Sequence, residues 1–420
     1  MSGKEQVIEV DSLPMDIVVG ATYSIKQSNP NSFTHGMFKY PCKFIPEIPR
    51  WALNKYSSKQ GVIFDPFVGS GTTILEANIN GIDAYGTEID DIAKLITRVK
   101  TRKMSPEQMK IIQDCHVDLQ HIIENVNYPK YRPEINNLEH WFPVKTIEEL
   151  GRIRTYVENI FDTQVREFFM VCMVSIIKKV SYADDTSPKP YVSTKILKEP
   201  QTVKKEFSSI TTRYMKMLYE LNELDDFGHC EIVEGDALNF KLDKKIDLAI
   251  TSPPYINAFD YGRTMRLENL WMGLLTEEGL RAKKASYVGT EKIKIIDEEK
   301  NLEILNKSKL LKQYYEIIYK HDRKRALVVK KFFEDMKINM ELIYDNLNEG
   351  GKYIIVIGNS AIRKVNVESW KVLEELGESI GFNSIENFSY IIQNPYIRIP
   401  RNGLGGKISK DFILVLQKGA

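Results

Sequence analysis

Strand-length apolar runs alternate with longer amphipathic runs over much of this chain. Such apolar runs occur at 61–67, 83–90 and 230–238, and the second ends in acidic residues. Between the first two, GSGTTILEANINGI begins at a tight glycine turn and continues with helical spacing. A strand, a helix and a strand in this order predict one parallel unit of a doubly wound α/β sheet.

The alternation continues in the second half of the chain. KIDLAITS, at 245–252, predicts another strand, and ALVVKKFFEDMKINMELIYDNL followed by NEGGKYIIVIGN predicts a helix, a glycine stop and a strand. The last two apolar runs, SIENFSYIIQ and DFILVLQK, predict an antiparallel pair at the sheet edge. The pattern as a whole predicts an α/β, Rossmann-like fold with a mostly parallel twisted sheet of about seven strands.

Two segments break the alternation and read as mostly helical insertions. Residues 101–228 carry helical patterns such as REFFMVCMVSIIKKV, and residues 275–325 are rich in Lys, Glu and Tyr. We therefore predict one body made of 1–100 and 229–420, with an insertion at 101–228 and a second helical insertion at 275–325.

Composition narrows the classes of partner. The formal net charge of the 420 residues is +1, so a nucleic-acid partner would need a local basic patch. The four cysteines are scattered without a CxxC pair, which argues against a zinc site or a disulfide framework and suits a reducing cytosol. No run approaches the length of a membrane span, and the first residues lack an apolar signal core. We expect a cytoplasmic protein with no metal and no membrane contact.

Polar and glycine residues follow three of the predicted strands where a parallel sheet binds its ligand. Gly69 and Gly71 allow a close backbone approach, and the helix after them offers free N–H groups. Glu88 ends the second strand, where an acid commonly binds ribose hydroxyls, and Asp236 follows the third, where a carboxylate can accept from an adenine amino group. Singly, each acid is better explained as a solvated loop end or a helix cap. Together with the glycine turn they indicate an adenosine-containing ligand. No Walker lysine and no GxGxxG is present, which disfavours triphosphate hydrolysis and hydride transfer.

The stretch TSPPY, 251–255, stops a buried strand abruptly. Two prolines remove two backbone donors and fix φ, so the strand cannot continue and the loop is rigid. A loop of this kind suits a site for a flat polar group. Taken alone, it is better explained as an ordinary strand-ending turn.

FDPFVGSGTT followed downstream by TSPPY resembles the S-adenosylmethionine-dependent DNA amino-methyltransferases. The Ser-Pro-Pro-Tyr version is most typical of those that methylate cytosine at N4. THGMFKYPCKFIPEIPRWAL, at 34–53, is similar to the family stretch over the methionine end of the cofactor, and NEGGKYIIVIGNS matches a later strand and turn. The resemblance covers 31–100 and 229–420. The chain departs from the family in lacking an obvious recognition domain after the last strand.

The resemblance implies a role for each matching residue. Around the cofactor S-adenosylmethionine it places Lys43, Phe44, Asp65, Phe67, Gly69 and Gly71, with Glu88 at the ribose and Asp236 at the adenine. The catalytic residues that it implies are Ser252, Pro253, Pro254 and Tyr255. The Ser252 hydroxyl and the Pro253 carbonyl would accept hydrogen bonds from the target amino group, and the Tyr255 ring would stack on the base. Arg263 and Arg266 follow closely and have two readings of equal weight, phosphate contacts to the flipped strand or pairs on a helix surface. We read His35 as a structural loop histidine.

The implied activity is transfer of a methyl group to N4 of a flipped cytosine in a specific double-stranded DNA sequence. The implied setting is bacterial or archaeal restriction–modification or phage defence, with a cognate restriction endonuclease or defence subunits as partners. We expect the insertion at 101–228 to read the DNA, with 275–325 as the second candidate. Two alternatives stay open: the same fold acting on adenine N6 or on an RNA amino group, and an inactive nucleic-acid-binding subunit. The sequence leaves the recognition sequence undetermined.

Overall fold

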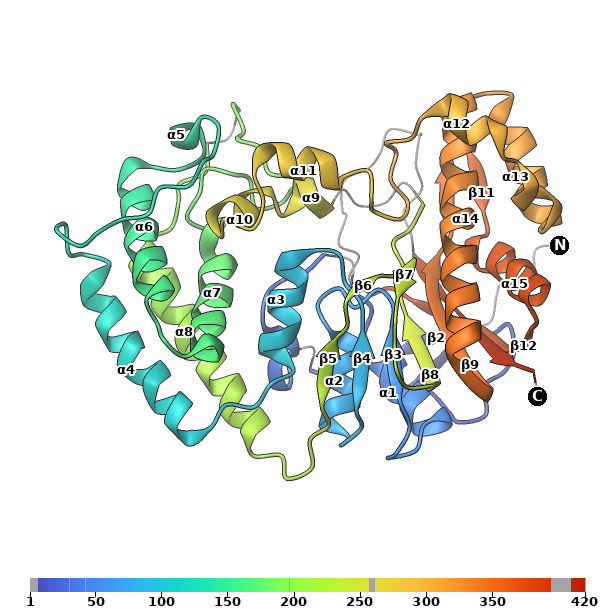
Figure 1. Cartoon of the computed structure of the whole chain (residues 1–420), viewed down its shortest axis with the longest axis horizontal. Coiled ribbons are helices and arrows are strands. Elements are labelled where there is room, and N and C mark those ends of the chain that lie inside the picture. Colours follow the sequence, from blue (N-terminus) through green and yellow to red (C-terminus); the bar gives the residue numbers. More distant parts are fainter. Residues whose placement is uncertain are drawn as a thin grey trace.

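The structure is a computed structural model that describes residues 7–29, 31–41, 43–195, 197–256, 261–393 and 409–419. A nine-stranded sheet runs through the molecule (Figure 1). Across the sheet its strands are β1 (Val7–Val10), β2 (Thr22–Ile25), β12 (Phe382–Ile391), β13 (Lys410–Lys418), β9 (Leu347–Gly358), β8 (Ile246–Thr251), β3 (Ile63–Asp65), β4 (Ala84–Gly86) and β5 (Cys230–Ile232).

The sheet is parallel except at one strand. β13 pairs antiparallel with both β12 and β9, whereas the other neighbouring strands described in this sheet pair parallel. β3 lies between β4 and β8, so the chain order reverses at this strand. Such a reversal opens a crevice at the carboxyl ends of the strands, which is where open α/β sheets bind ligands.

Successive residues of the strands point to opposite faces, and each face is covered by helices. Ile63 and Ile354 belong to a core with α1 (Glu47–Tyr56) and α2 (Thr72–Ile79). Their neighbours Phe64 and Ile355 pack on the other face with α13 (Lys309–Tyr319), α14 (Arg323–Asn346) and α15 (Ser369–Ile380). This alternation makes a three-layer body with a buried central sheet.

A third apolar core belongs to the helical region beside the sheet, on the left in Figure 1. Residues 101–228 supply most of it, and side chains from before and after that insertion join it, such as Ile96 and Trp271. The helices concerned are α3 (Asp91–Lys100), α4 (Pro106–Ile122), α5 (Leu138–Trp141), α6 (Val144–Glu158), α7 (Thr163–Ile177), α8 (Val203–Asn222) and α10 (Arg266–Trp271). The insertion therefore packs directly on the body through α3 and α10.

The remaining elements lie mostly near the carboxyl ends of the strands. They are η1 (Phe33–Gly36), β6 (Gly235–Asp236), β7 (Asn239–Phe240), α9 (Tyr261–Thr264), α11 (Glu277–Lys283), α12 (Ile295–Lys300), η2 (Glu303–Asn306), β10 (Ser360–Ile362) and β11 (Val365–Val367). Within the described ranges, no helix combines the length and apolar character needed to cross a membrane.

The predicted fold class is confirmed, with two corrections in detail. The sheet has nine strands rather than about seven, because two short strands near the amino terminus, β1 and β2, extend it. For the same reason the antiparallel pair β12–β13 is not at the edge: β2 pairs with β12 and β1 covers β2. Four-residue strands carry too short a pattern to be recognised in sequence.

Candidate active site

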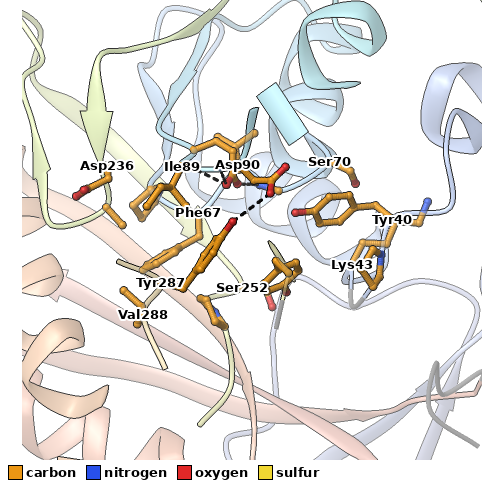
Figure 2. A pocket seen from close by; sticks show the side chains of 18 of the residues that line it. Tyr40, Lys43, Phe67, Ser70, Ile89, Asp90, Asp236, Ser252, Tyr287 and Val288 are labelled. Atoms are coloured by element: carbon orange, nitrogen blue, oxygen red, sulfur yellow. Dashed lines mark hydrogen bonds between the residues drawn. The ribbon is translucent and has the colours of Figure 1, made fainter. Parts of the chain in front are cut away.

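A cavity with about 820 Å3 of empty volume, its mouth included, opens at the carboxyl ends of β3, β4 and β8 (Figure 2). Several separate stretches of the chain contribute to its lining: Tyr40, Pro41, Lys43 and Phe44; residues 66–70 and Thr72; residues 88–90; residues 236–238; Ser252 and Pro254; and Tyr261 with residues 286–288. Sequence-distant segments thus meet at the point where the strand order reverses.

The glycine turn after β3 needs its glycines for conformation and for space. Gly69 and Gly71 have φ of 53° and 77°, values that disfavour residues with a side chain. A Cβ on Gly71 would also come within 2.9 Å of the Thr97 side chain. Ser70 lies between them, lines the cavity and has a buried hydroxyl with no hydrogen-bond partner among the described residues. The turn therefore presents backbone and an available hydroxyl to a ligand.

Asp65, the last residue of β3, links the glycine turn to the TSPPY loop. Its Oδ1 accepts hydrogen bonds from the Phe67 N–H at 3.0 Å and from the Thr251 hydroxyl at 2.6 Å. Burial raises the pKa of Asp65 to about 6, against the lowering effect of these hydrogen bonds. Its Oδ2 is buried without a partner in the described structure. Asp65 itself is almost fully buried behind the cavity wall formed by Phe67 and its neighbours.

Glu88 lies in the cavity at the end of β4, and backbone groups hold both of its oxygens. Oε2 accepts from the Gly69 N–H at 2.7 Å, and Oε1 accepts from the N–H groups of Ile89 and Asp90 at 2.8 Å each. Burial, with Asp90 close by, raises the pKa of Glu88 to about 7 despite these bonds. The carboxylate is thus rigidly placed. Both lone pairs of Oε1 are used, and Oε2 keeps one lone pair for a ligand hydroxyl.

The resemblance places Glu88 at the ribose of the cofactor, and such a contact would make cofactor affinity depend on pH. Ribose hydroxyls would donate to the ionised carboxylate, so binding would favour the deprotonated form, and protonation below the raised pKa would oppose it. We expect affinity to fall about tenfold from about pH 8 to about pH 6. Calorimetry over this range tests the expectation, with Glu88→Gln as the control, which should bind more weakly and lose most of the slope. A wild-type affinity that does not vary with pH would count against a ribose contact.

Asp236 lies at the other end of the cavity, where the neighbouring lining side chains are apolar. It ends β6, and its Oδ1 accepts from the Leu238 N–H at 2.8 Å, which sets the turn into β7. Around it the cavity is lined by Ile89, Leu238 and Val288, from three separate segments (Figure 2). Apolar side chains beside one carboxylate suit a flat ring that carries an amino group.

Two residues of the TSPPY loop, Ser252 and Pro254, line the same cavity. Pro253 is buried between them, and Tyr255 is partly buried with its hydroxyl donating to Asp411 Oδ1 at 2.6 Å. The structure therefore brings Ser252 into one cavity with Glu88 and Asp236, as a common site for these residues requires.

The segment before α1 closes the cavity on the side of the glycine turn. Lys43 and Phe44 line it, and Lys43 Nζ donates to the His35 carbonyl at 3.0 Å. Burial lowers the pKa of Lys43. His35 itself is buried, with Nε2 at 2.9 Å from Glu76 Oε1, away from the cavity. This placement agrees with a structural histidine.

The two arginines after the TSPPY loop lie outside the cavity lining. Arg266 pairs with Glu277 and lies over the Trp141 ring, with its guanidinium carbon 5.1 Å from the ring centroid. Pairing on the helix surface is therefore the arrangement this structure gives Arg266. Arg263, on α9, is exposed.

Sequence reasoning missed three tyrosines and an aspartate in the cavity. The rings of Tyr40 and Tyr261 stack 5.9 Å apart, and those of Tyr261 and Tyr287 lie 6.3 Å apart. The Tyr287 hydroxyl donates to Asp90 Oδ2 at 3.2 Å (Figure 2). Tyr287 comes from the second insertion, so that insertion forms part of the cavity wall. In the sequence, only the high tyrosine content of 275–325 indicated that this insertion could contribute to a site. A local sequence pattern does not predict such long-range contacts.

A family model described as DNA methylase matches residues 5–98, which hold the segment before α1, the glycine turn and Glu88. This match supports a DNA methyltransferase over that part of the chain. The match covers the cofactor side of the cavity and does not separate action on adenine N6 from action on cytosine N4.

Three relatives extend the likeness of this chain beyond the family match. It is 23% identical to the Type II methyltransferase M.MvaI of Kocuria varians, over 93% of this chain and 92% of that protein. It is 23% identical to Type II methyltransferase M.AvaI of a Nostoc strain, over 85% of this chain and 80% of that protein. It is 27% identical to the Type II methyltransferase M.BsoBI of Geobacillus stearothermophilus, over 71% of this chain and 62% of that protein.

The cofactor of this methyltransferase is S-adenosylmethionine. The cavity suits it on its own chemistry: a carboxylate for hydroxyl groups at Glu88, a slot with one acceptor at Asp236, and an unpartnered buried hydroxyl at Ser70. No group of three or more His, Cys, Asp or Glu side chains suited to a metal ion occurs in the described parts of the chain.

Proposed function

We propose that this DNA methyltransferase transfers a methyl group to N4 of a flipped cytosine within a specific DNA sequence. The observation that carries the proposal is the meeting of Ser252 with Glu88 and Asp236 in one cavity. Thr251, next to Ser252, is bound to Asp65 at the glycine turn, so the loop for the base and the turn for the cofactor have fixed relative positions.

For the cofactor, each part has a complementary group. Glu88 binds the ribose hydroxyls and Asp236 accepts from the adenine amino group, with Ile89 and Leu238 on the ring faces. At the methionine end we assign Asp65, Phe67, Gly69 and Gly71, closed over by Lys43 and Phe44. The bound cofactor supplies an activated methyl group on a positively charged sulfur.

For the base, the loop residues act on the amino group. An exocyclic base amine is a poor nucleophile because its lone pair is delocalised into the ring. The Ser252 hydroxyl and the Pro253 carbonyl accept its two hydrogens and so favour a tetrahedral nitrogen with a free lone pair. Pro254 keeps the loop rigid and Tyr255 stacks on the base. The methylated ammonium is very acidic and needs no strong base, so the remaining barrier is one of positioning and electrostatics.

The presence of Ser252 at a position where an acidic residue could stand supports cytosine rather than adenine as the target base. We keep methylation of adenine N6 as the second candidate, because the family model and the TSPPY geometry suit either amine. The Type II relatives support a bacterial restriction–modification setting, with a cognate endonuclease acting on the same sequence.

The test is label transfer from S-adenosylmethionine to unmethylated mixed-sequence DNA, run beside an equal mass of RNA. We expect label in DNA alone. Label in RNA alone would transfer the activity to the RNA alternative. No label in either, with cofactor binding intact, would support an inactive binding subunit instead.

We also propose that the insertion at 101–228 reads the DNA. Its loop between α7 and α8 lies at the same end of the molecule as the carboxyl ends of the strands (Figure 1). Lys189 and Lys195 are exposed on that loop. The loop and the cavity therefore face one side, where a duplex with a flipped base would lie.

Replacing Lys189 and Lys195 together by alanine should weaken DNA binding and flatten its salt dependence by about two counterions. Exposed Lys110 and Lys216, on α4 and α8 away from that loop, provide a matched double control that should change neither. Fluorescence anisotropy titrations at several salt concentrations measure both quantities. Equal behaviour of the two double variants would move recognition to another surface, with 275–325 the next candidate.

A further inference from the structure

A buried polar cluster lies behind the TSPPY loop and outside the cavity lining. At its centre is Asp411 on β13, which is 5% exposed. Its Oδ1 accepts from the Tyr255 hydroxyl at 2.6 Å, and its Oδ2 accepts from the Tyr390 hydroxyl at 2.8 Å. One buried carboxylate thus binds two tyrosine hydroxyls, which offsets part of the cost of burying it.

The sheet holds this carboxylate in place. Asp411 is opposite Tyr390 of β12 on one side and Gly358 of β9 on the other, in two antiparallel ladders. Hydrogen bonds therefore join Tyr390, Asp411 and Tyr255.

The contact determines how Tyr255 presents its ring. The two prolines before it restrict the backbone, and the bond to Asp411 ties the far end of the side chain to the sheet. With both ends fixed, the ring has little freedom to rotate. Because the Tyr255 hydroxyl is hydrogen-bonded to Asp411, the face of the ring is the part of the side chain that can contact a base.

We propose that Asp411 is a positioning residue that holds the Tyr255 ring in one plane for the target base. The proposal rests on the proposed function, in which Tyr255 stacks on that base. A ring that is already oriented adds no ordering cost when the base arrives, whereas a loose ring has to be ordered at that moment. Asp411 touches neither base nor cofactor in this account and acts through Tyr255.

A purely structural role would give a different result. If Asp411 served only to satisfy two buried hydroxyls, its loss would lower thermal stability and leave the rate of the folded enzyme unchanged. A positioning role lowers the rate while cofactor affinity stays the same.

The experiment compares Tyr255→Phe, Asp411→Asn, their double variant and Tyr390→Phe. Tyr255→Phe keeps the ring and removes its anchor, and Tyr390→Phe is the matched control that removes the other hydroxyl from the same carboxylate. Measurements are kcat and KM on unmethylated mixed-sequence DNA, cofactor affinity by calorimetry, and the melting temperature.

We expect about a tenfold loss of kcat in Tyr255→Phe and in Asp411→Asn, with no further loss in the double variant. Tyr390→Phe should lose less than about threefold, and cofactor affinity should hold throughout.

Tyr255→Ala separates this proposal from the function on which it rests. If Tyr255→Ala is inactive while Tyr255→Phe and Asp411→Asn keep the wild-type rate, the ring is needed but its anchoring by Asp411 is not, and the proposal is overturned. If Tyr255→Ala keeps the wild-type rate, the stacking role itself fails. Should Asp411→Asn not fold, equal kcat values for Tyr255→Phe and Tyr390→Phe would overturn the proposal as well.

Discussion

Ser252→Ala should lower the methylation rate about 100-fold or more, while the cofactor affinity stays close to that of the wild type. The hydroxyl accepts from the amine most strongly when the nitrogen becomes tetrahedral, so its loss raises the barrier far more than it weakens binding. Single-turnover kinetics and calorimetry measure the two quantities separately.

Ser286→Ala is the matched control for this variant. Ser286 lines the same cavity, and its hydroxyl donates to the Lys283 carbonyl at 2.7 Å, within the second insertion. The same chemical change there should leave the rate within about twofold, an effect of a few tenths of a kcal/mol. If both serine variants keep the wild-type rate, Ser252 does not grip the amine, and the catalytic assignment of the loop is lost.

Asp236→Ala should weaken binding of S-adenosylmethionine by roughly 1–3 kcal/mol, which is about 5- to 150-fold in affinity. The loss combines the hydrogen bond from the adenine amino group with the support that Oδ1 gives to the turn at Leu238. DNA affinity should change little, because Asp236 lies at the cofactor end of the cavity. Calorimetry of the cofactor and anisotropy of labelled DNA provide the two measurements.

Asp236→Asn separates the two parts of this effect. Its side-chain oxygen can still accept from the Leu238 N–H, so the turn is kept, whereas the negative charge toward the adenine amine is removed. We expect an affinity between those of the wild type and of Asp236→Ala. Unchanged cofactor affinity in both variants would remove Asp236 from the adenine pocket.

The sequence was sufficient to predict the parts of this molecule that depend on local pattern. Gly69 and Gly71 do have positive φ, and the strand–helix–strand unit around them was predicted within a few residues of its observed limits. Because the carboxyl ends of parallel strands meet at one edge, Glu88 and Asp236 were expected in one site, and they line one cavity.

Contacts between distant segments could not be predicted in this way. Tyr287 reaches Asp90 across nearly 200 residues of sequence, and Tyr255 reaches Asp411 across more than 150. Strand β2 adds to the sheet beside β12, at the opposite end of the chain. None of these pairs has a spacing that a helical or strand period would mark, because the folding of the whole chain brings them together.

We propose that the site accepts cytosine and modifies its exocyclic amine. Mass spectrometry of nucleosides from DNA methylated by the wild-type enzyme identifies the modified base. We expect N4-methylcytosine as the modified nucleoside, absent when Ser252→Ala replaces the wild type. N6-methyladenine as the sole product would contradict the assignment of the base.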